Sequence, residues 1–184
     1  GKVPYHCYPD LRLTGYAGGE KISGKAWMDH QWGNKGWFIS KQDQSQLLGW
    51  DWFGINLVDG THLIVIIHKY AKTNEIVNST TVILRDGKPA QFVDGVTATP
   101  LEYWESPKTH IKYPICWEIE IESLDLSLTF RPTSHDQEIP VFGLARAIWE
   151  GVGSVEGTMF GRKITGRARG EFCGYGYIFD FQNF

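Results

Sequence analysis

The chain has 184 residues, the size of one domain, and a formal net charge of -3 spread over interspersed acidic and basic residues. No basic stripe is present to follow a phosphate backbone, and no apolar run approaches the roughly 18 residues of a membrane span, so neither a nucleic-acid partner nor a transmembrane segment is expected. The three cysteines, Cys7, Cys116 and Cys173, lack the short spacings of zinc ligands, and we expect no metal site.

The N-terminal residues show no charged start followed by an apolar core, the pattern of a signal peptide. We expect a soluble protein and slightly favour the cytoplasm. Secretion stays open if a signal peptide has been removed, so the compartment is unknown.

Alternation with a period of two residues marks a strand at positions 50–57. One side carries Asp51, Phe53, Ile55 and Leu57, and the other carries Trp50, Trp52 and Asn56. Asp59-Gly60 follows, and then a second apolar run over His62–Tyr70. Asp-Gly between apolar runs predicts a hairpin because both turn positions need positive φ.

The same period continues through the second half of the chain. Positions 115–122 and 124–130 alternate and form either one bent strand or two, and Phe160-Gly161 separates two further runs as a hairpin would. Glu102–His110 is the least regular stretch and is interpreted as a loop. About nine to eleven short strands and no three-turn helix predict a single all-β domain over residues 1–184, an antiparallel meander barrel or a sandwich. A barrel of about eight to ten strands can hold one small ligand.

Positions 24–33 contain the first candidate site. In a continuous strand, Met28, His30 and Trp32 share one face, while Trp27 and Asp29 share the other with Gln31. An imidazole would then stand beside an indole. The alternative is that Asp29 and His30 satisfy backbone groups near a strand end.

Two further carboxylates are candidates. Asp51 lies between Trp50 and Trp52, and a carboxylate in apolar surroundings has a raised pKa, as a general acid at neutral pH requires. The alternative is an aspartate held by a lysine, an arginine or a backbone N–H. Glu138, and Glu150 next to Trp149, are either pocket carboxylates or charges at strand ends.

As a set, these residues resemble the AttH-like family, which includes carotenoid 1,2-hydratase, kievitone hydratase and lipocalin-like Diels–Alderases. The specific matching segments are AWMDHQWG at positions 26–33 and GWDWF at positions 49–53; weaker ones are Gln137-Glu138 and Trp149-Glu150-Gly151. The match is to the C-terminal half of a usual member. The resemblance implies a lipocalin-like barrel, with a missing N-terminal lipocalin-like half or a second copy as an open partner.

By this resemblance, the chain is expected to act without a cofactor as a hydratase or cyclase on a small hydrophobic, polyene or isoprenoid-like substrate. An acid would protonate a C=C bond and water would attack the carbocation. Asp51, His30 and Asp29 are the expected catalytic residues. The substrate-binding residues are expected to be Trp27, Trp32, Trp50, Trp52, Trp149, Glu138 and Glu150.

Two other functions stay open. A pericyclase of the Diels–Alderase kind would fold a flexible polyene into a reactive shape, and loss of a carboxylate would then cost little. A domain that only binds hydrophobic ligands would show no turnover. All three functions share the barrel, so the fold does not separate them.

Overall fold

The computed structural model describes residues 4–32, 48–140 and 147–176 of the chain. It divides into two compact units, Gly1–Ser40 and Lys41–Phe184. The single domain over residues 1–184 stays a prediction.

The smaller unit is a β-hairpin. Strand β1 (Tyr5–Ala17) pairs antiparallel with β2 (Glu20–Gln31). The turn uses Gly18 and Gly19, whose φ angles of 59° and 86° belong to the left-handed region that glycine enters without strain. His6 lies opposite His30 in the register, so the two imidazoles come from neighbouring strands.

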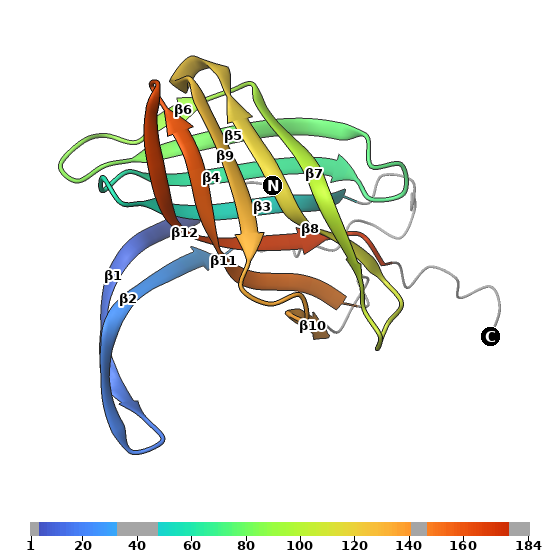
Figure 1. Ribbon diagram of the computed structural model, residues 1–184, viewed down its shortest axis with the longest axis horizontal. Helices are drawn as coiled ribbons and strands as arrows, with labels where there is room; N and C mark the ends of the chain where they lie inside the picture. The colour runs from blue at the N-terminus through green and yellow to red at the C-terminus, as the bar shows by residue number, and fades with distance from the viewer. Residues whose placement is uncertain (1–3, 33–47, 141–146, 177–184) are drawn as a thin grey trace. The chain divides into compact units, whose positions relative to one another are not determined.

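The larger unit is one antiparallel sheet of ten strands (Figure 1). Its strands are β3 (Leu48–Leu57), β4 (His62–Tyr70), β5 (Ile76–Leu84), β6 (Gln91–Val93), β7 (Val96–Glu105), β8 (Lys112–Ile121), β9 (Leu126–Pro132), β10 (Glu138–Pro140), β11 (Ala147–Met159) and β12 (Arg162–Cys173). A single 3₁₀ turn, Glu122–Leu124, is the only helical element among the described residues. No helix in the described part of the chain is long and apolar enough to cross a membrane.

The sheet has the connectivity of a meander barrel. Its order is β6-β5-β4-β3-β12-β11-β9-β8-β7, with β10 attached to β11. Successive strands are mostly neighbours, and the pairing of β12 with β3 joins the two ends of the meander. Figure 1 shows the sheet curling from β6 round to β7, the two strands at its hydrogen-bonded edges. The prediction of an all-β, lipocalin-like antiparallel barrel is confirmed.

The local turn predictions are mostly confirmed. Gly60 joins β3 to β4 with a φ of 82°, and Phe160-Gly161 joins β11 to β12 with φ of 51° and 69°. Positions 115–122 and 124–130 belong to two strands rather than one. The prediction of a loop over Glu102–His110 is wrong in its first part, because β7 continues to Glu105 and pairs there with Lys112.

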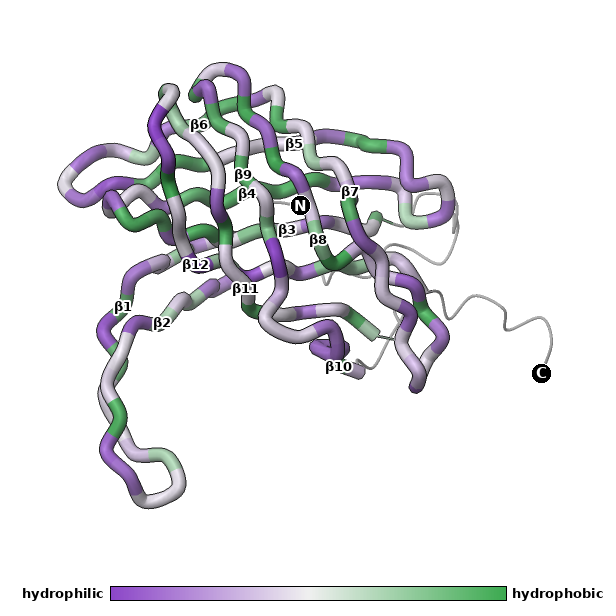
Figure 2. The backbone as a smooth tube through the Cα atoms, in the orientation of Figure 1, coloured by the Kyte–Doolittle hydropathy of each residue, from purple (hydrophilic) through white to green (hydrophobic). Residues whose placement is uncertain are grey.

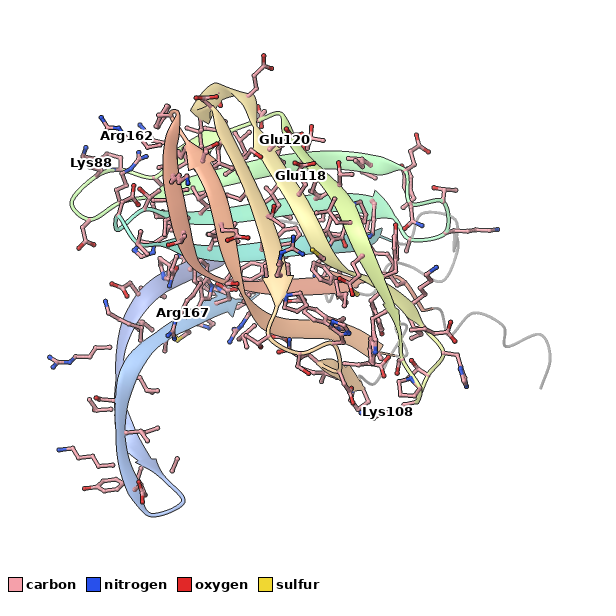
Figure 3. All side chains as sticks on the ribbon, viewed as in Figure 1. Lys88, Lys108, Glu118, Glu120, Arg162 and Arg167 are labelled. Atoms are coloured by element: carbon pink, nitrogen blue, oxygen red, sulfur yellow. The ribbon has the colours of Figure 1, made fainter. Side chains whose placement is uncertain are left out.

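Alternation places the core on one face of the sheet. The residues that β3, β4 and β8 contribute to the hydrophobic core recur every second position, and Figure 2 shows hydrophobic positions along these strands. Glu118 and Glu120, labelled in Figure 3, occupy the alternate positions of β8. Large aromatic side chains fill the core, among them Phe53, Trp117, Phe130, Trp149 and Phe172.

Candidate functional site

A single row of paired residues carries two of the predicted carboxylates. Glu138 pairs with Trp149, Trp149 with Phe172, and Phe172 with Asp51. These four residues come from β10, β11, β12 and β3. Trp149 and Phe172 stack between the carboxylates, with ring centroids 5.0 Å apart and planes 14° apart. The strand period therefore puts both carboxylates on the core side of the sheet.

Asp51 forms a buried polar cluster with two partners. Its Oδ2 accepts a hydrogen bond of 2.7 Å from Lys69 Nζ, and its Oδ1 accepts one of 2.8 Å from the Tyr175 hydroxyl. Lys69 Nζ also lies 3.6 Å from the centroid of the Tyr175 ring. Asp51 and Lys69 are only 4% and 3% exposed, so water screens their charges very little.

Burial acts on both members of the ion pair. It raises the pKa of Asp51, while Lys69 and Tyr175 oppose that effect. It lowers the pKa of Lys69, while the charge of Asp51 opposes it. Burial, followed by Asp51, also raises the pKa of Tyr175, which therefore stays a hydroxyl donor. The cluster holds one proton for which a carboxylate and an amine compete.

Glu138 is held by three hydroxyl groups. Its Oε1 accepts hydrogen bonds from Thr109 Oγ1 at 2.5 Å and the Tyr113 hydroxyl at 3.0 Å, and its Oε2 accepts one from Ser106 Oγ at 2.6 Å. Burial, followed by Glu138, raises the pKa of Tyr113, so this group also stays protonated. Lys108, labelled in Figure 3, lies in the same turn and binds Asp136 instead.

Two tyrosine rings connect the clusters. The rings of Tyr113 and Tyr175 meet edge to face with centroids 6.0 Å apart, and Trp104 stacks on Tyr113 at 6.4 Å. A continuous path of contacts therefore runs from Lys69 through Asp51 and the two tyrosines to Glu138. We call these five residues the two-carboxylate cluster.

Tyr175 reaches the cluster because the chain changes direction at Gly174. Phe172 faces the core, and strict alternation would turn residue 175 away from it. Gly174 adopts a φ of 93°, which breaks the alternation. A Cβ on Gly174 would lie 2.8 Å from Gly49 Cα, so β3 and the end of β12 approach closely only with glycine at this position.

The other residues of the same segments lie on the opposite face of the sheet. Trp50 donates its indole N–H to Glu171 Oε1 at 2.9 Å, and Trp52 pairs with Glu171 in the register. Glu150 approaches Arg169 with 3.9 Å between its Oε1 and Nη1. The structure therefore separates Trp50, Trp52 and Glu150 from Asp51, while it brings Trp149 and Glu138 onto the face of Asp51.

The hairpin carries the remaining predicted residues. The rings of His30 and Trp32 have centroids 4.8 Å apart, and His6 meets Trp32 edge to face at 4.9 Å. Asp29 accepts a hydrogen bond of 2.8 Å from Trp27 Nε1. The predicted faces of this strand are thus confirmed. The catalytic roles of His30 and Asp29 and the binding roles of Trp27 and Trp32 stay predictions.

Sequence reasoning missed Lys69, Tyr113 and Tyr175. Lys69 continues the inward period of Leu63, Val65 and Ile67, and Tyr113 begins the inward period of β8, so both signals were present. Tyr175 follows a glycine that breaks the period, and alternation alone would have placed it on the wrong face.

Comparisons with known proteins concern the family and the fold of the chain. The family model described as AttH-like matches residues 3–175. A dehydratase, asqC of Emericella nidulans, is 26% identical over 116 residues, which are 60% of this chain and 30% of that protein. None of the site residues is assigned by this similarity.

Two solved structures share the fold. A crystal structure described as AttH from Nitrosomonas europaea has a TM-score of 0.72 at 25% identity, over 94% of this chain and 52% of its own. Kievitone hydratase from Nectria haematococca has a TM-score of 0.71 at 18% identity, over 93% of this chain and 52% of its own. The chain thus spans about half or less of the length of these relatives. Because the family model covers nearly the whole sequence, the chain belongs to the AttH-like family.

Proposed function

We propose that this chain takes part in a hydratase or dehydratase reaction, in which water is added to, or removed from, a C=C bond of an apolar, isoprenoid-like substrate. The two-carboxylate cluster carries the proposal, because it places two proton-transfer groups in an apolar core. The names of two relatives, a dehydratase and a hydratase, support the same class of reaction.

The Asp51 cluster is the proposed acid. Asp51 and Lys69 share one transferable proton, and burial shifts it toward the carboxyl, against the charge of Lys69 and the hydrogen bond from Tyr175. Transfer of that proton to one carbon of the C=C bond would leave a carbocation at the other carbon. The ring of Tyr113 would stabilise such a cation by about 0.5–2 kcal/mol, since the ring of Tyr175 already faces Lys69 Nζ.

Glu138 is the proposed base. Water forms the new C–O bond with the carbocation and must lose a proton to yield the alcohol. The carboxylate of Glu138 takes this proton directly, or Tyr113 passes its hydroxyl proton to Glu138 and accepts the proton of water. Dehydration is the same sequence in reverse. Since the reaction needs only an acid and a base, the proposal invokes no cofactor.

The decisive experiment follows hydration and isotope exchange in D₂O. The purified chain is incubated with farnesol or β-farnesene, and mass spectrometry measures the water-added product and deuterium in the recovered alkene. Wild type should give both signals. Asp51→Asn should lose both, because no proton reaches the alkene. Glu138→Gln should keep deuterium exchange and lose the alcohol, because only the second step needs a base.

Glu120→Gln is the matched control, since it removes an exposed carboxylate from the alternate positions of β8 and should change neither signal. A product of unchanged mass that survives Asp51→Asn would replace the proposal by a pericyclase. Quenching of tryptophan fluorescence without any product would replace it by ligand binding alone.

A further inference from the structure

Thr81 presents a buried hydroxyl that none of the interactions above uses. The residue lies in β5 and is fully buried, at 0% exposure. Among the residues that the structure describes, its Oγ1 has no hydrogen-bond partner. Buried polar groups are satisfied in the great majority of cases, so an unpaired hydroxyl in a native core calls for an explanation.

The register places Thr81 on the same face as the two-carboxylate cluster. Thr81 pairs with Val65 on β4 and with Val93 on β6, and Val65 belongs to the apolar core. Two residues along the strands from this row, the row that contains Asp51 and Ile67 continues to Ser79 on β5. The hydroxyl therefore faces the same concave side of the sheet as Asp51.

Sheet geometry gives the separation of the two groups. Asp51 and Thr81 lie two strands apart and two residues apart along the strand direction. With about 4.8 Å between strands and about 3.3 Å per residue, their backbones are about 12 Å apart along the sheet. The apolar positions between them include Ile67 and Val65, which are 3% and 0% exposed.

We infer that Thr81 binds an oxygen of the substrate, and that the substrate is an apolar chain with a hydroxyl or carbonyl group about 12 Å from its reacting C=C bond. The inference rests on the proposed function for the identity of the reacting bond. It adds a specificity-determining residue at the end of the site opposite the acid. A hydroxyl both donates and accepts, so either an alcohol or a ketone would be recognised.

The test compares two probes of the same carbon skeleton. Farnesol carries a terminal hydroxyl and β-farnesene lacks it, and both are titrated against the full chain by quenching of tryptophan fluorescence. Wild type should bind farnesol about 3- to 10-fold more tightly, the value of one hydrogen bond. Thr81→Val, which replaces the hydroxyl by a methyl group of similar size, should abolish this preference without weakening the binding of β-farnesene.

Stability provides a second readout that does not involve a ligand. If the hydroxyl is unpaired in the free protein, Thr81→Val should raise Tm by about 2–4 °C, because it removes a buried polar group that nothing satisfies. Thr80→Val is the matched control, because the neighbouring residue lies on the other face of β5 and is half-buried. This variant should keep the preference for farnesol and should not raise Tm.

Several results would overturn the inference. A lower Tm in Thr81→Val would show that the hydroxyl has a structural partner, and an unchanged preference for farnesol would show that it does not contact the probe. Wild type that binds neither probe would also exclude it. Failure of the proposed reaction looks different: Asp51→Asn would leave product formation intact, while the Thr81→Val effects on binding and Tm would remain.

Discussion

Lys69 Nζ lies 2.7 Å from Asp51 Oδ2, and both side chains are almost completely buried. Taking two charges out of water costs several kcal/mol for each ion, and their attraction offsets this cost only while both are present. Removal of one member alone therefore leaves a buried charge without its partner, whereas removal of both members does not.

Lys69→Met should destabilise the protein strongly. It keeps an unbranched side chain, shorter by one atom, but leaves the Asp51 carboxylate buried without its cation, at a cost of about 3–5 kcal/mol in the free energy of unfolding. Urea unfolding at neutral pH measures this effect. The pKa of Asp51 should rise further in this variant, since its main opposing charge is gone.

The double variant Asp51→Asn/Lys69→Met is the control for this prediction. Because it removes both charges, it should be more stable than Lys69→Met alone, with a coupling energy of about 1–3 kcal/mol. If the double variant lost the sum of the two single effects, Asp51 and Lys69 would not interact, contrary to the observed geometry.

Alkaline pH should destabilise the protein partly through Cys173. Burial, followed by the charge of Glu171, raises the pKa of this thiol from 9.0 to about 12. The folded pKa is therefore above the unfolded one, and the stabilisation is complete below about pH 9. As pH rises from about 9 to 12, the unfolded state binds fewer protons than the folded state, and up to about 4 kcal/mol is lost.

Comparison with Cys173→Ala isolates this contribution. Lys69 acts in the opposite direction over part of the same range, because its pKa is lowered and its stabilisation grows with pH. Lys69 titrates in both proteins, and the difference between them also contains its charge interaction with the Cys173 thiolate. Unfolding free energies measured between pH 8 and about 10.5 should fall more steeply for wild type than for the variant. Equal slopes would mean that the thiol is accessible to water in the folded state.

Glu138→Gln should loosen the turn between β7 and β8. The carboxylate binds the hydroxyls of Ser106 and Thr109, and these accept hydrogen bonds from the backbone N–H groups of Lys108, Thr109 and Ile111. The side-chain amide of glutamine has one accepting oxygen in place of two, so it cannot accept all three hydrogen bonds, and about 1–3 kcal/mol should be lost locally. Hydrogen exchange at these amides should accelerate several-fold.

Exchange at the far end of β8 is the internal control for that variant. The amides of Ile119 and Ile121 lie in the paired, buried part of the strand and should keep their protection. Faster exchange along the whole of β8 would indicate global destabilisation rather than release of the turn. This result also guides the D₂O experiment, because loss of alcohol formation can be attributed to a missing base only if the fold persists.

The sequence predicted much of the fold because alternation and Asp-Gly turns are local signals. The inward position of Asp51, for example, follows from the period it shares with Phe53 and Ile55. It did not predict the partners of that carboxylate. Lys69 is only 18 positions away, but Tyr175 is 124 positions away and reaches Asp51 through the pairing of β12 with β3.

The predicted role of the tryptophans shows a second limit. Composition suggested that the indoles beside Asp51 would form its surroundings, but neighbours in a strand point to opposite faces, and Trp50 and Trp52 lie on the other side of the sheet. The aromatic groups that do contact the carboxylates, Tyr113 and Tyr175, come from distant parts of the chain. Only the register of the whole barrel brings them together.

Gly174→Ala should disrupt the site through the backbone. The residue has a φ of 93°, and its Cβ would come within 2.8 Å of Gly49 Cα, a backbone atom that has no room to move. Strain in this region costs about 1–3 kcal/mol. Because the turn at Gly174 directs Tyr175 toward Asp51, the variant should also weaken the hydrogen bond between these two side chains.

Gly24→Ala is the matched control, since Gly24 lies in a strand with nothing within 4 Å of its added Cβ. Urea unfolding should separate the two variants by more than about 1 kcal/mol, and turnover should fall only in Gly174→Ala. If Gly174→Ala retained wild-type stability but lost turnover, the glycine would serve to position Tyr175 and not to let the strands approach. Retention of both would contradict the close packing of β3 against the end of β12.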